Sequence, residues 1–446
     1  MTSLFARDAL LPDGWARDVR IDVDAAGNIS SVAKQSAPGG AEKLAGPVLP
    51  GMANLHSHAF QRAMAGLAEV RGPSEDDFWT WRDLMYQFVE RLTPERAQAV
   101  ATHLYIDMLK HGYTAVGEFH YVHDNTADML LRHLAAAKQC GIAITLLPSL
   151  YRWSNFGKQP LQPRQQRFDS SAKSILAIFE NLYRQKTPDI NVGVAPHSLR
   201  AVDHRSLQEL IAEVRKQSSE APIHIHAAEQ TKEVDDSLAE LGKRPVEWLL
   251  ENMNVDGHWC LVHATHMTPE EATALARSGA TAGLCPTTEG NLGDGIFPLL
   301  AYREAGGSYG IGGDSHVSRD PAEELRLLEY VQRLTTRRRN LVVGTHSSAV
   351  GTTLWLEAAA GAKALGRRMG GIATGMRADL VVLDAAHPDL VGRSGDLIAN
   401  ALIFSGATNL VRDVMVGGNW VVRERRHAHE ESARGAYVRT VTELLR

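Results

Sequence analysis

The chain has 446 residues, of which 44% are hydrophobic and 22% are charged, and its formal net charge is −5. These are ordinary values for a globular protein and argue against a disordered chain. The charge gives no reason to expect nucleic acid, because the dense basic run is limited to Arg337, Arg338 and Arg339. The N-terminal region resembles neither a signal peptide nor a membrane span, and the scarce cysteines suit a reducing compartment. We therefore expect a cytoplasmic protein that binds neither membranes nor nucleic acid.

Both ends of the chain are rich in short apolar runs. Residues 1–48 interrupt such runs with Gly, Pro and Asp, which is typical of small antiparallel strands and turns. Residues 378–384 and 411–422 read as strands, the second broken by a Gly-Gly turn. Because the termini of a domain often lie together, we predict one small β-sandwich domain from residues 1–48 and 366–446.

In the middle of the chain, residues 49–365, apolar runs of strand length alternate with helical stretches such as the one carrying Leu207, Leu210, Ile211 and Val214. This alternation predicts βαβ units and a parallel sheet. The strand candidates are the run ending at His58 and residues 115–119, 142–147, 192–195, 223–226, 260–263, 281–285 and 309–312. Eight such strands predict an α/β fold, a TIM-like (β/α)8 barrel that forms the catalytic domain. The polar segment from Trp153 to Ser170 is expected to loop over the barrel mouth.

The first of these strands ends in a His-x-His pair, His56 and His58. Alternate residues of a strand point the same way, so both imidazoles can reach one metal ion. Imidazole is the commonest protein ligand for zinc and similar metals. The pair therefore predicts part of a metal site, with the remaining ligands supplied from distant parts of the chain.

Later strands end in further candidates: His226 follows the fifth, His263 the sixth and Asp314 the eighth. In parallel barrels the catalytic groups come from the C-terminal ends of several strands, so these residues are expected to meet at one rim. A hydrolytic one-metal site needs about four protein ligands and an open position for water. We predict that His56, His58, His226 and Asp314 are the ligands.

Three residues are expected to handle protons. Glu229 lies three residues past His226, where its carboxylate can fold back over the metal without binding it, so we predict a proton shuttle. His263 can donate a hydrogen bond to the attacking hydroxide or polarise the electrophile. Asp314 can both touch the metal and accept the proton of the attacking water.

The ordered His-x-His, His-x-x-Glu, His and Gly-x-Asp elements resemble the amidohydrolase superfamily over essentially the whole chain. Binuclear members carry a lysine at the end of the fourth strand, and no lysine stands between Val192 and Pro196. The resemblance therefore implies the one-metal, deaminase-like branch. It implies one divalent metal ion as cofactor, with zinc favoured and iron suited by the same ligands, and a homodimer.

Within that branch, residues 54–64, 196–200 and 224–230 are similar to the formimidoylglutamate deiminases. These enzymes hydrolyse N-formimino-L-glutamate to N-formyl-L-glutamate and ammonia in histidine degradation. The similarity implies that the substrate is contacted by Gln61, Arg82, Tyr121, His197 and Arg200. A guanidinium fork at Arg200 suits a carboxylate of such a small-molecule substrate. For Arg82, a surface arginine packed on tryptophan stays open as an alternative.

Two other functions remain open at this stage. One is a deaminase of the same branch that acts on a nucleobase or related amidine, of the guanine or S-adenosylhomocysteine type. Its pocket needs amide and aromatic groups that read a ring. The other is a non-catalytic metal-binding scaffold barrel, against which the presence of Glu229 and His263 argues.

Overall fold

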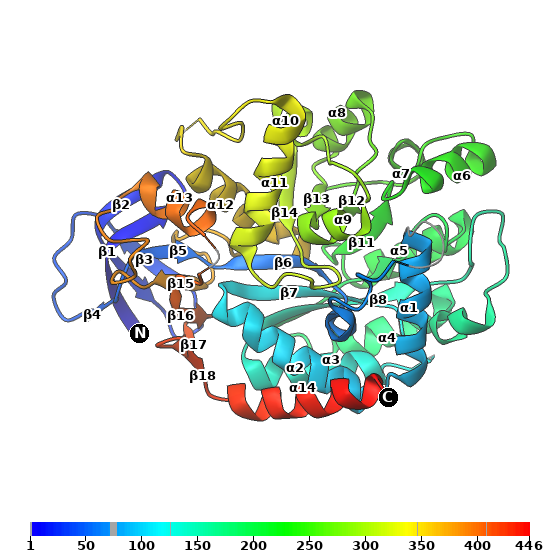
Figure 1. Ribbon diagram of the computed structural model, residues 1–446, viewed down its shortest axis with the longest axis horizontal. Coiled ribbons are helices and arrows are strands. Elements are labelled where there is room, and N and C mark those ends of the chain that lie inside the picture. The colour runs from blue at the N-terminus through cyan, green and yellow to red at the C-terminus, as the bar shows by residue number, and fades with distance from the viewer. Residues whose placement is uncertain (1, 72–77, 125, 346, 407) are drawn as a thin grey trace.

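The computed structural model describes residues 2–71, 78–124, 126–345, 347–406 and 408–446. Its described strands form two sheets of nine strands each. Figure 1 shows the sheet built from the chain ends beside the sheet of the central residues, along the long axis of the molecule. The α/β barrel and the β-rich terminal unit predicted from the sequence are both present.

Strands from both ends of the chain hydrogen-bond into the terminal sheet. In spatial order this sheet contains β18 (Arg426–His427), β17 (Asn419–Arg423), β16 (Val411–Val416), β15 (Leu380–Leu383), β5 (Val48–Pro50), β1 (Thr2–Leu11), β2 (Gly14–Val23) and β3 (Ile29–Ala33), with β4 (Glu42–Lys43) paired to β1. The two chain ends meet where β5 pairs antiparallel with β15. Leu4, Ile21, Leu380 and Met415 belong to one fully buried cluster, which joins the two ends through their side chains as well. The predicted Gly-Gly turn is Gly417–Gly418, and both glycines have positive φ, 54° and 79°, which glycine adopts without steric cost.

The central sheet is an all-parallel barrel. Its strands are β6 (Met52–Ser57), β7 (Tyr113–His120), β8 (Ala143–Leu150), β9 (Ile190–Val192), β10 (Ala195–Pro196), β11 (Ile223–Ala227), β12 (Trp259–His263), β13 (Thr281–Leu284) and β14 (Ser308–Ile311). Isolated parallel bridges, Val194 to Ile223 and Ser198 to His226, join the fourth and fifth positions and close the ring.

The fourth predicted strand differs from a continuous strand, since it is divided into β9 and β10 around Gly193 and Val194. A Cβ atom on Gly193 would lie 2.3 Å from the carbonyl oxygen of Pro222. Glycine therefore permits the close backbone approach by which the barrel closes at this point. The prediction placed the strand correctly but did not anticipate the break.

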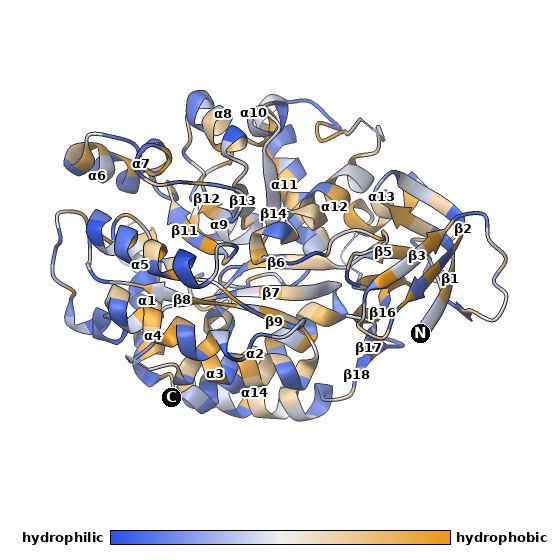
Figure 2. Cartoon of the chain, turned by 180° about the vertical axis from the view of Figure 1, so that it is seen from behind, coloured by the Kyte–Doolittle hydropathy of each residue, from blue (hydrophilic) through white to orange (hydrophobic). Residues whose placement is uncertain are grey.

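Helices surround the barrel strands. Those between β6 and β15 are α1 (Phe78–Arg91), α2 (Pro94–Lys110), α3 (Asp128–Cys140), α4 (Ala172–Tyr183), α5 (His204–Gln217), α6 (Thr231–Leu241), α7 (Pro245–Asn252), α8 (Pro269–Ser278), α9 (Pro286–Leu292), α10 (Leu299–Glu304), α11 (Pro321–Thr336) and α12 (Val350–Ala360), with 3-10 turns η1 (Ala59–Met64), η2 (Pro163–Phe168) and η3 (Gly361–Leu365). The predicted periodicity at Leu207, Leu210, Ile211 and Val214 belongs to α5, where Ile211 is partly buried and the other three are buried. Figure 2 shows hydrophobic and hydrophilic residues alternating along outer helices such as α3 and α4, as expected when one helix face packs on the strands.

Two further helices follow β15: α13 (Asp396–Phe404) and α14 (Glu430–Leu444). The C-terminal α14 leaves the terminal sheet and packs along α2 on the outside of the barrel (Figure 1). No helix in the described ranges combines the length and apolarity needed to cross a membrane.

Candidate active site

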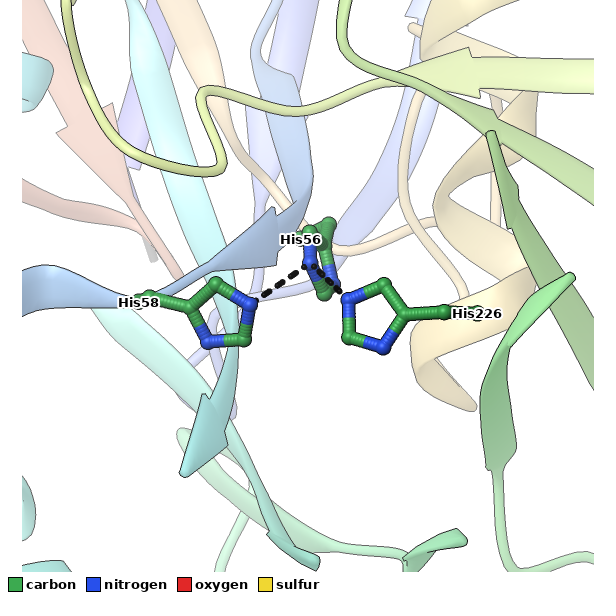
Figure 3. Close-up of side chains that lie close together, drawn as sticks. All are labelled: His56, His58 and His226. Atoms are coloured by element: carbon green, nitrogen blue, oxygen red, sulfur yellow. Dashed lines mark hydrogen bonds between the residues drawn. The ribbon is translucent and has the colours of Figure 1, made fainter. Parts of the chain in front are cut away.

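Three histidines and one aspartate converge at the C-terminal rim of the barrel. The Nε2 atom of His56 lies 3.1 Å from that of His58 and 3.0 Å from that of His226. Figure 3 shows His56 between the rings of His58 and His226, which approach it from opposite sides. Asp314 places Oδ1 3.7 Å from His56 Nε2 and 3.5 Å from His58 Nε2. The side chains predicted to be ligands are therefore gathered around one point.

This donor set fits a divalent metal ion. Tetrahedral zinc with bonds of about 2.0–2.2 Å separates neighbouring ligand atoms by roughly 3.3–3.6 Å, close to the distances found here. His58 donates from Nδ1 to the carbonyl of Phe119 at 2.6 Å, and His226 donates from Nδ1 to that of His197 at 2.9 Å. Each of these bonds leaves the Nε2 lone pair facing the common centre. Burial lowers the pKa of His58 to about 3, so its imidazole is the neutral form that binds metals.

The backbone at this rim is strained where the site residues leave their strands. Ala228, His263 and Asp314 have φ values of 51°, 65° and 47°, in the left-handed region that residues with a Cβ rarely occupy. For Asp314 the conformation is held by hydrogen bonds from its N–H to the carbonyl of His56 and from His58 N–H to its own carbonyl. Such strain is typical of sites at which side-chain direction matters more than local stability.

Glu229 and His263 lie on the side of Asp314 away from His58. His263 Nε2 is 3.7 Å from Glu229 Oε1 and 3.6 Å from Asp314 Oδ2. Burial lowers the pKa of His263, but the nearby carboxylates of Glu229, Glu289 and Asp314 outweigh it and raise the pKa to about 10. The structure thus brings the three residues predicted to move protons next to the predicted ligands.

A cavity of about 540 Å³, its open mouth included, leads to this cluster. All five residues predicted to contact the substrate line it. The lining comprises His58, Gln61, Phe78, Trp81, Arg82, Met85, Tyr86, Tyr121, Tyr151, Phe168, His197, Arg200, His226, Glu229, His263, Leu292 and Asp314. Phe168, at the end of η2, comes from the segment that was expected to loop over the mouth, so this part of the segment reaches the cavity.

Two arginines bring positive charge into the cavity. Arg200 is 5% exposed, and no described residue accepts a hydrogen bond from its guanidinium or pairs with it within 4.0 Å. Burial disfavours its charge, yet the carboxylates of Glu233 and Glu229 hold its pKa above the usual value. Arg82 lies with its guanidinium carbon 4.4 Å from the centre of the Trp79 ring, and its buried Nε and Nη1 have no hydrogen-bond partner among the described residues. Arg82 therefore does both things that the sequence left open: its guanidinium packs on a tryptophan, and its side chain lines the cavity.

The remaining predicted contact residues are polar groups set among aromatic rings. Gln61 donates from Nε2 to the hydroxyl of Tyr121 at 2.8 Å, while its buried Oε1 has no hydrogen-bond partner in the part of the chain that the structure describes. His197 lies 4.7 Å from Tyr151 between ring centres and holds Nδ1 3.1 Å from Ser198 Oγ. The cavity thus offers an unpaired acceptor near the metal-ligand cluster and cations farther along its wall.

Sequence reasoning missed three buried carboxylates that support the site. Glu233 accepts from the N–H groups of Ala228 at 3.2 Å and Glu229 at 3.1 Å. Glu118 accepts from Ser57 Oγ at 2.7 Å and from Ala59 N–H at 3.0 Å, behind the His-x-His pair. Glu289 lies 3.2 Å from His263 Nδ1. Glu118 sits in a predicted strand and could have been suspected as a charge in an apolar run; the other two carry no local signal.

Comparison with known proteins agrees with the fold and identifies the family. A model described as Amidohydrolase family matches residues 48–421, and one described as the N-terminal domain of formimidoylglutamate deiminase HutF matches residues 1–46. A formimidoylglutamate deiminase of Pseudomonas aeruginosa is 50% identical and is covered over 100% of both chains. A 5-methylthioadenosine/S-adenosylhomocysteine deaminase of Natronomonas pharaonis is 29% identical over 85% of this chain and 82% of its own.

Solved structures are similar as well. An amidohydrolase from Brucella melitensis superposes with a TM-score of 0.93 at 44% identity over 100% of both chains. An adenosine deaminase from Xanthomonas campestris with bound zinc gives 0.82 at 22% identity over 99% of this chain and 98% of its own, which supports the fold alone. The chain therefore belongs to the amidohydrolase family and, within it, to the formimidoylglutamate deiminases, which makes it a hydrolase acting on C–N bonds.

Proposed function

We propose that the chain hydrolyses N-formimino-L-glutamate to N-formyl-L-glutamate and ammonia, a step of histidine degradation. The observation that carries this proposal is the buried Arg200 guanidinium, which lines the cavity without an anionic partner among the described residues. The carboxylates of Glu233 and Glu229 favour this charge from a distance, but its N–H groups have no acceptor among the described residues, so we expect a substrate carboxylate to accept from them. The buried, unpaired Nε and Nη1 of Arg82 supply a second place for a carboxylate. A substrate with two carboxylates fits both.

One divalent metal ion is part of this proposal, zinc before iron, held by His56, His58, His226 and Asp314. Such an ion supplies Lewis acidity that lowers the pKa of a water molecule towards neutrality. The support is the set of Nε2 lone pairs and the Asp314 carboxylate that surround one point.

The reaction moves both protons of one water molecule onto the leaving nitrogen. Water adds to the formimino carbon, the C–N bond to the terminal nitrogen breaks, and the oxygen stays as the formyl carbonyl. Asp314 Oδ2 is placed to accept the first proton, because its Oδ1 faces the histidine ligands and Oδ2 faces His263. Glu229 is placed to carry a proton to the nitrogen. His263 Nε2 stands between the two carboxylates and can donate to the developing negative charge on oxygen.

The cavity wall orients the other end of the substrate. Arg200 and Arg82 are assigned to the carboxylates, and their fork geometry suits bidentate pairing. Gln61 is assigned to the amidine N–H, which its Oε1 can accept because no described residue bonds this atom. The Tyr121 hydroxyl accepts a hydrogen bond from Nε2 of Gln61 and so holds the amide in this orientation. His197 packs between Tyr151 and His226 and completes the wall beside the metal ligands.

We also propose that residues 1–48 and 366–446 form the β-sandwich domain and residues 49–365 the catalytic barrel. The pairing of β5 (Val48–Pro50) with β15 and the start of β6 at Met52 support the N-terminal boundary to within about two residues. The helix α14 belongs to residues 366–446 but packs on α2 of the barrel. We infer a cytoplasmic homodimer that binds neither nucleic acid nor membranes. The three cysteines are free and buried, which suits a reducing compartment.

A substrate panel tests the proposed function. Metal-loaded protein is mixed with N-formimino-L-glutamate, guanine, adenosine and S-adenosylhomocysteine, and ammonia release is followed. We expect release from formiminoglutamate at a kcat/KM at least about a thousandfold above the purine compounds. Guanine and adenosine offer no carboxylate to the arginines, and S-adenosylhomocysteine offers one where formiminoglutamate offers two. A purine turned over faster than formiminoglutamate would instead support the nucleobase deaminase. No release from any compound would favour the scaffold barrel.

A further inference from the structure

The His263 ring is held from both sides by carboxylates. On the cavity side, Nε2 faces Glu229 and Asp314 at 3.7 and 3.6 Å. On the opposite side, Nδ1 lies 3.2 Å from Oε1 of Glu289. A carboxylate is expected to act as the acceptor in such a pair, so Nδ1 is the donor and carries a proton. This bond fixes which nitrogen of His263 points at the reacting atoms.

Glu289 has no route to the substrate itself. It does not belong to the described cavity lining, and its side chain is buried inside the turn that begins α9. The same Oε1 atom accepts from the N–H of Cys285 at 2.8 Å, and the Glu289 backbone carbonyl accepts from the N–H of Asp294. The carboxylate is thus fixed by the end of β13 and by α9, independently of the metal ligands.

His263 needs such support because its backbone does not provide it. The residue leaves β12 with φ 65°, and Ala264 follows with φ 49°, so the ring direction does not follow from the alternation of the strand. The backbone is pinned by the bonds from Ala264 N–H to the carbonyls of Ala227 and Val262. Of the described residues, Glu289 is the one that bonds the Nδ1 side of the ring.

We propose that Glu289 is a positioning residue of the reaction that acts through His263. It holds Nδ1–H, so that Nε2 faces Glu229, Asp314 and the attacking water. The kinetic part of this inference rests on the proposed function. The hydrogen bond between Glu289 and Nδ1 of His263 does not depend on which substrate is hydrolysed.

The kinetic experiment compares Glu289→Gln with a matched control, Glu324→Gln, in metal-loaded protein. Glu324 is also a buried carboxylate and lies in the first turn of α11, from which it accepts hydrogen bonds at the start of α9, from Thr287 N–H at 2.9 Å and Thr287 Oγ1 at 2.6 Å. It supports the same helix and bonds no site residue. We expect Glu289→Gln to lower kcat by about 10–100-fold with KM within about threefold and full metal content, as for partners that orient a reacting imidazole. The control should keep kcat within about twofold.

A double-mutant cycle asks whether Glu289 acts through His263. In a His263→Asn background, Glu289→Gln should change kcat by less than about twofold, because the ring it positions is absent. A loss as large as in the wild-type background would overturn the proposal, and so would an equal loss of kcat in Glu324→Gln.

A spectroscopic measurement keeps the inference testable if formiminoglutamate is not the substrate. In zinc-loaded protein labelled with 15N-histidine, the His263 resonances are identified by their absence in His263→Asn. We expect Glu289→Gln to shift the Nδ1 resonance of His263, whereas Glu324→Gln leaves it in place. An unchanged His263 resonance in Glu289→Gln would disprove the bond. Lack of turnover by the wild type would contradict the proposed function and would leave the Glu289–His263 bond to be decided by the resonance.

Discussion

His56 and His226 place their Nε2 atoms 3.0 Å apart although 170 residues separate them in the chain. Two neutral imidazoles that face each other with their lone pairs repel unless a proton or a metal ion lies between them. The nitrogens on the far side of His58 and His226 already donate to backbone carbonyls, which leaves their lone pairs turned inward. The arrangement is explained by a metal ion, and the following predictions depend on it.

We predict one divalent metal ion per chain and its loss in His226→Asn. Removing a direct ligand should lower metal affinity by more than about a hundredfold, beyond the effect of an outer partner. His224→Asn is the matched control, because His224 is buried on the same strand but bonds the carbonyl of Ala364 at 2.8 Å. Elemental analysis of folded protein checks both variants. Two tightly held metal ions per active chain, or full metal content in His226→Asn, would refute the assignment.

Glu229→Gln is expected to keep its metal and lose about two to four orders of magnitude in kcat, the usual weight of a general acid–base group. The physical reason is that the leaving nitrogen must gain protons, and an amide cannot deliver them. Steady-state ammonia release with parallel metal analysis measures this. Glu271→Gln serves as control, since Glu271 is a buried carboxylate that pairs with Arg244 at 2.7 Å away from the cavity. Near-normal kcat in metal-replete Glu229→Gln would remove Glu229 from this role.

Arg200→Met should lower kcat/KM for formiminoglutamate by a few orders of magnitude while leaving metal content intact. Loss of one partner of a buried charge pair typically costs about 2 to 5 kcal/mol. An uncharged formamidine has no carboxylate to lose, so any weak activity on it should survive. If both substrates are affected equally, Arg200 supports the fold or the metal site instead. If neither is affected, the carboxylate is bound elsewhere, with Arg82 the next candidate.

The stability of the protein should depend on pH through Glu324. Burial raises the pKa of this carboxyl from 4.5 to about 8. The folded state therefore binds a proton more tightly than the unfolded state, so the contribution is fully present below pH 4.5 and is lost as the pH rises towards 8. The loss is on the order of a few kcal/mol.

Glu324→Gln isolates this effect, because a protonated carboxyl and an amide offer similar donors and acceptors to Thr287. The melting temperature of the variant relative to the wild type should rise steadily between pH 5 and pH 8. A constant difference over that range would show that Glu324 does not titrate in the folded protein.

Much of the fold was predictable from the sequence because each barrel strand is a short apolar run with a distinct end. His58, His226, His263 and Asp314 mark those ends, and a parallel barrel brings strand ends together whatever their separation in sequence. The break at Gly193 was not predictable, since it depends on how closely the Pro222 carbonyl approaches from another strand. The position of α14 along α2 depends in the same way on packing between distant segments.

The candidate site was predictable only in part. Ligand and substrate-contact candidates lie in short motifs, but Glu233 and Glu289 bond the site residues from the first turns of helices whose own sequences show nothing unusual. Glu233 bonds the turn just before its own helix, whereas Glu289 reaches the site only because the fold brings α9 against the end of β12. Arg82 and Arg200 were named from the sequence as substrate contacts, but only the structure shows that both line one cavity and that no described carboxylate pairs with either guanidinium.

The identity of the broken bond tests the central claim most directly, because the formimino carbon carries two C–N bonds. Metal-loaded protein and N-formimino-L-glutamate are incubated in water enriched in 18O, and the products are analysed by mass spectrometry. The account predicts equal amounts of ammonia and N-formyl-L-glutamate, the latter with one 18O atom in its formyl group. Glutamate together with formamide, or the absence of any product, would contradict it.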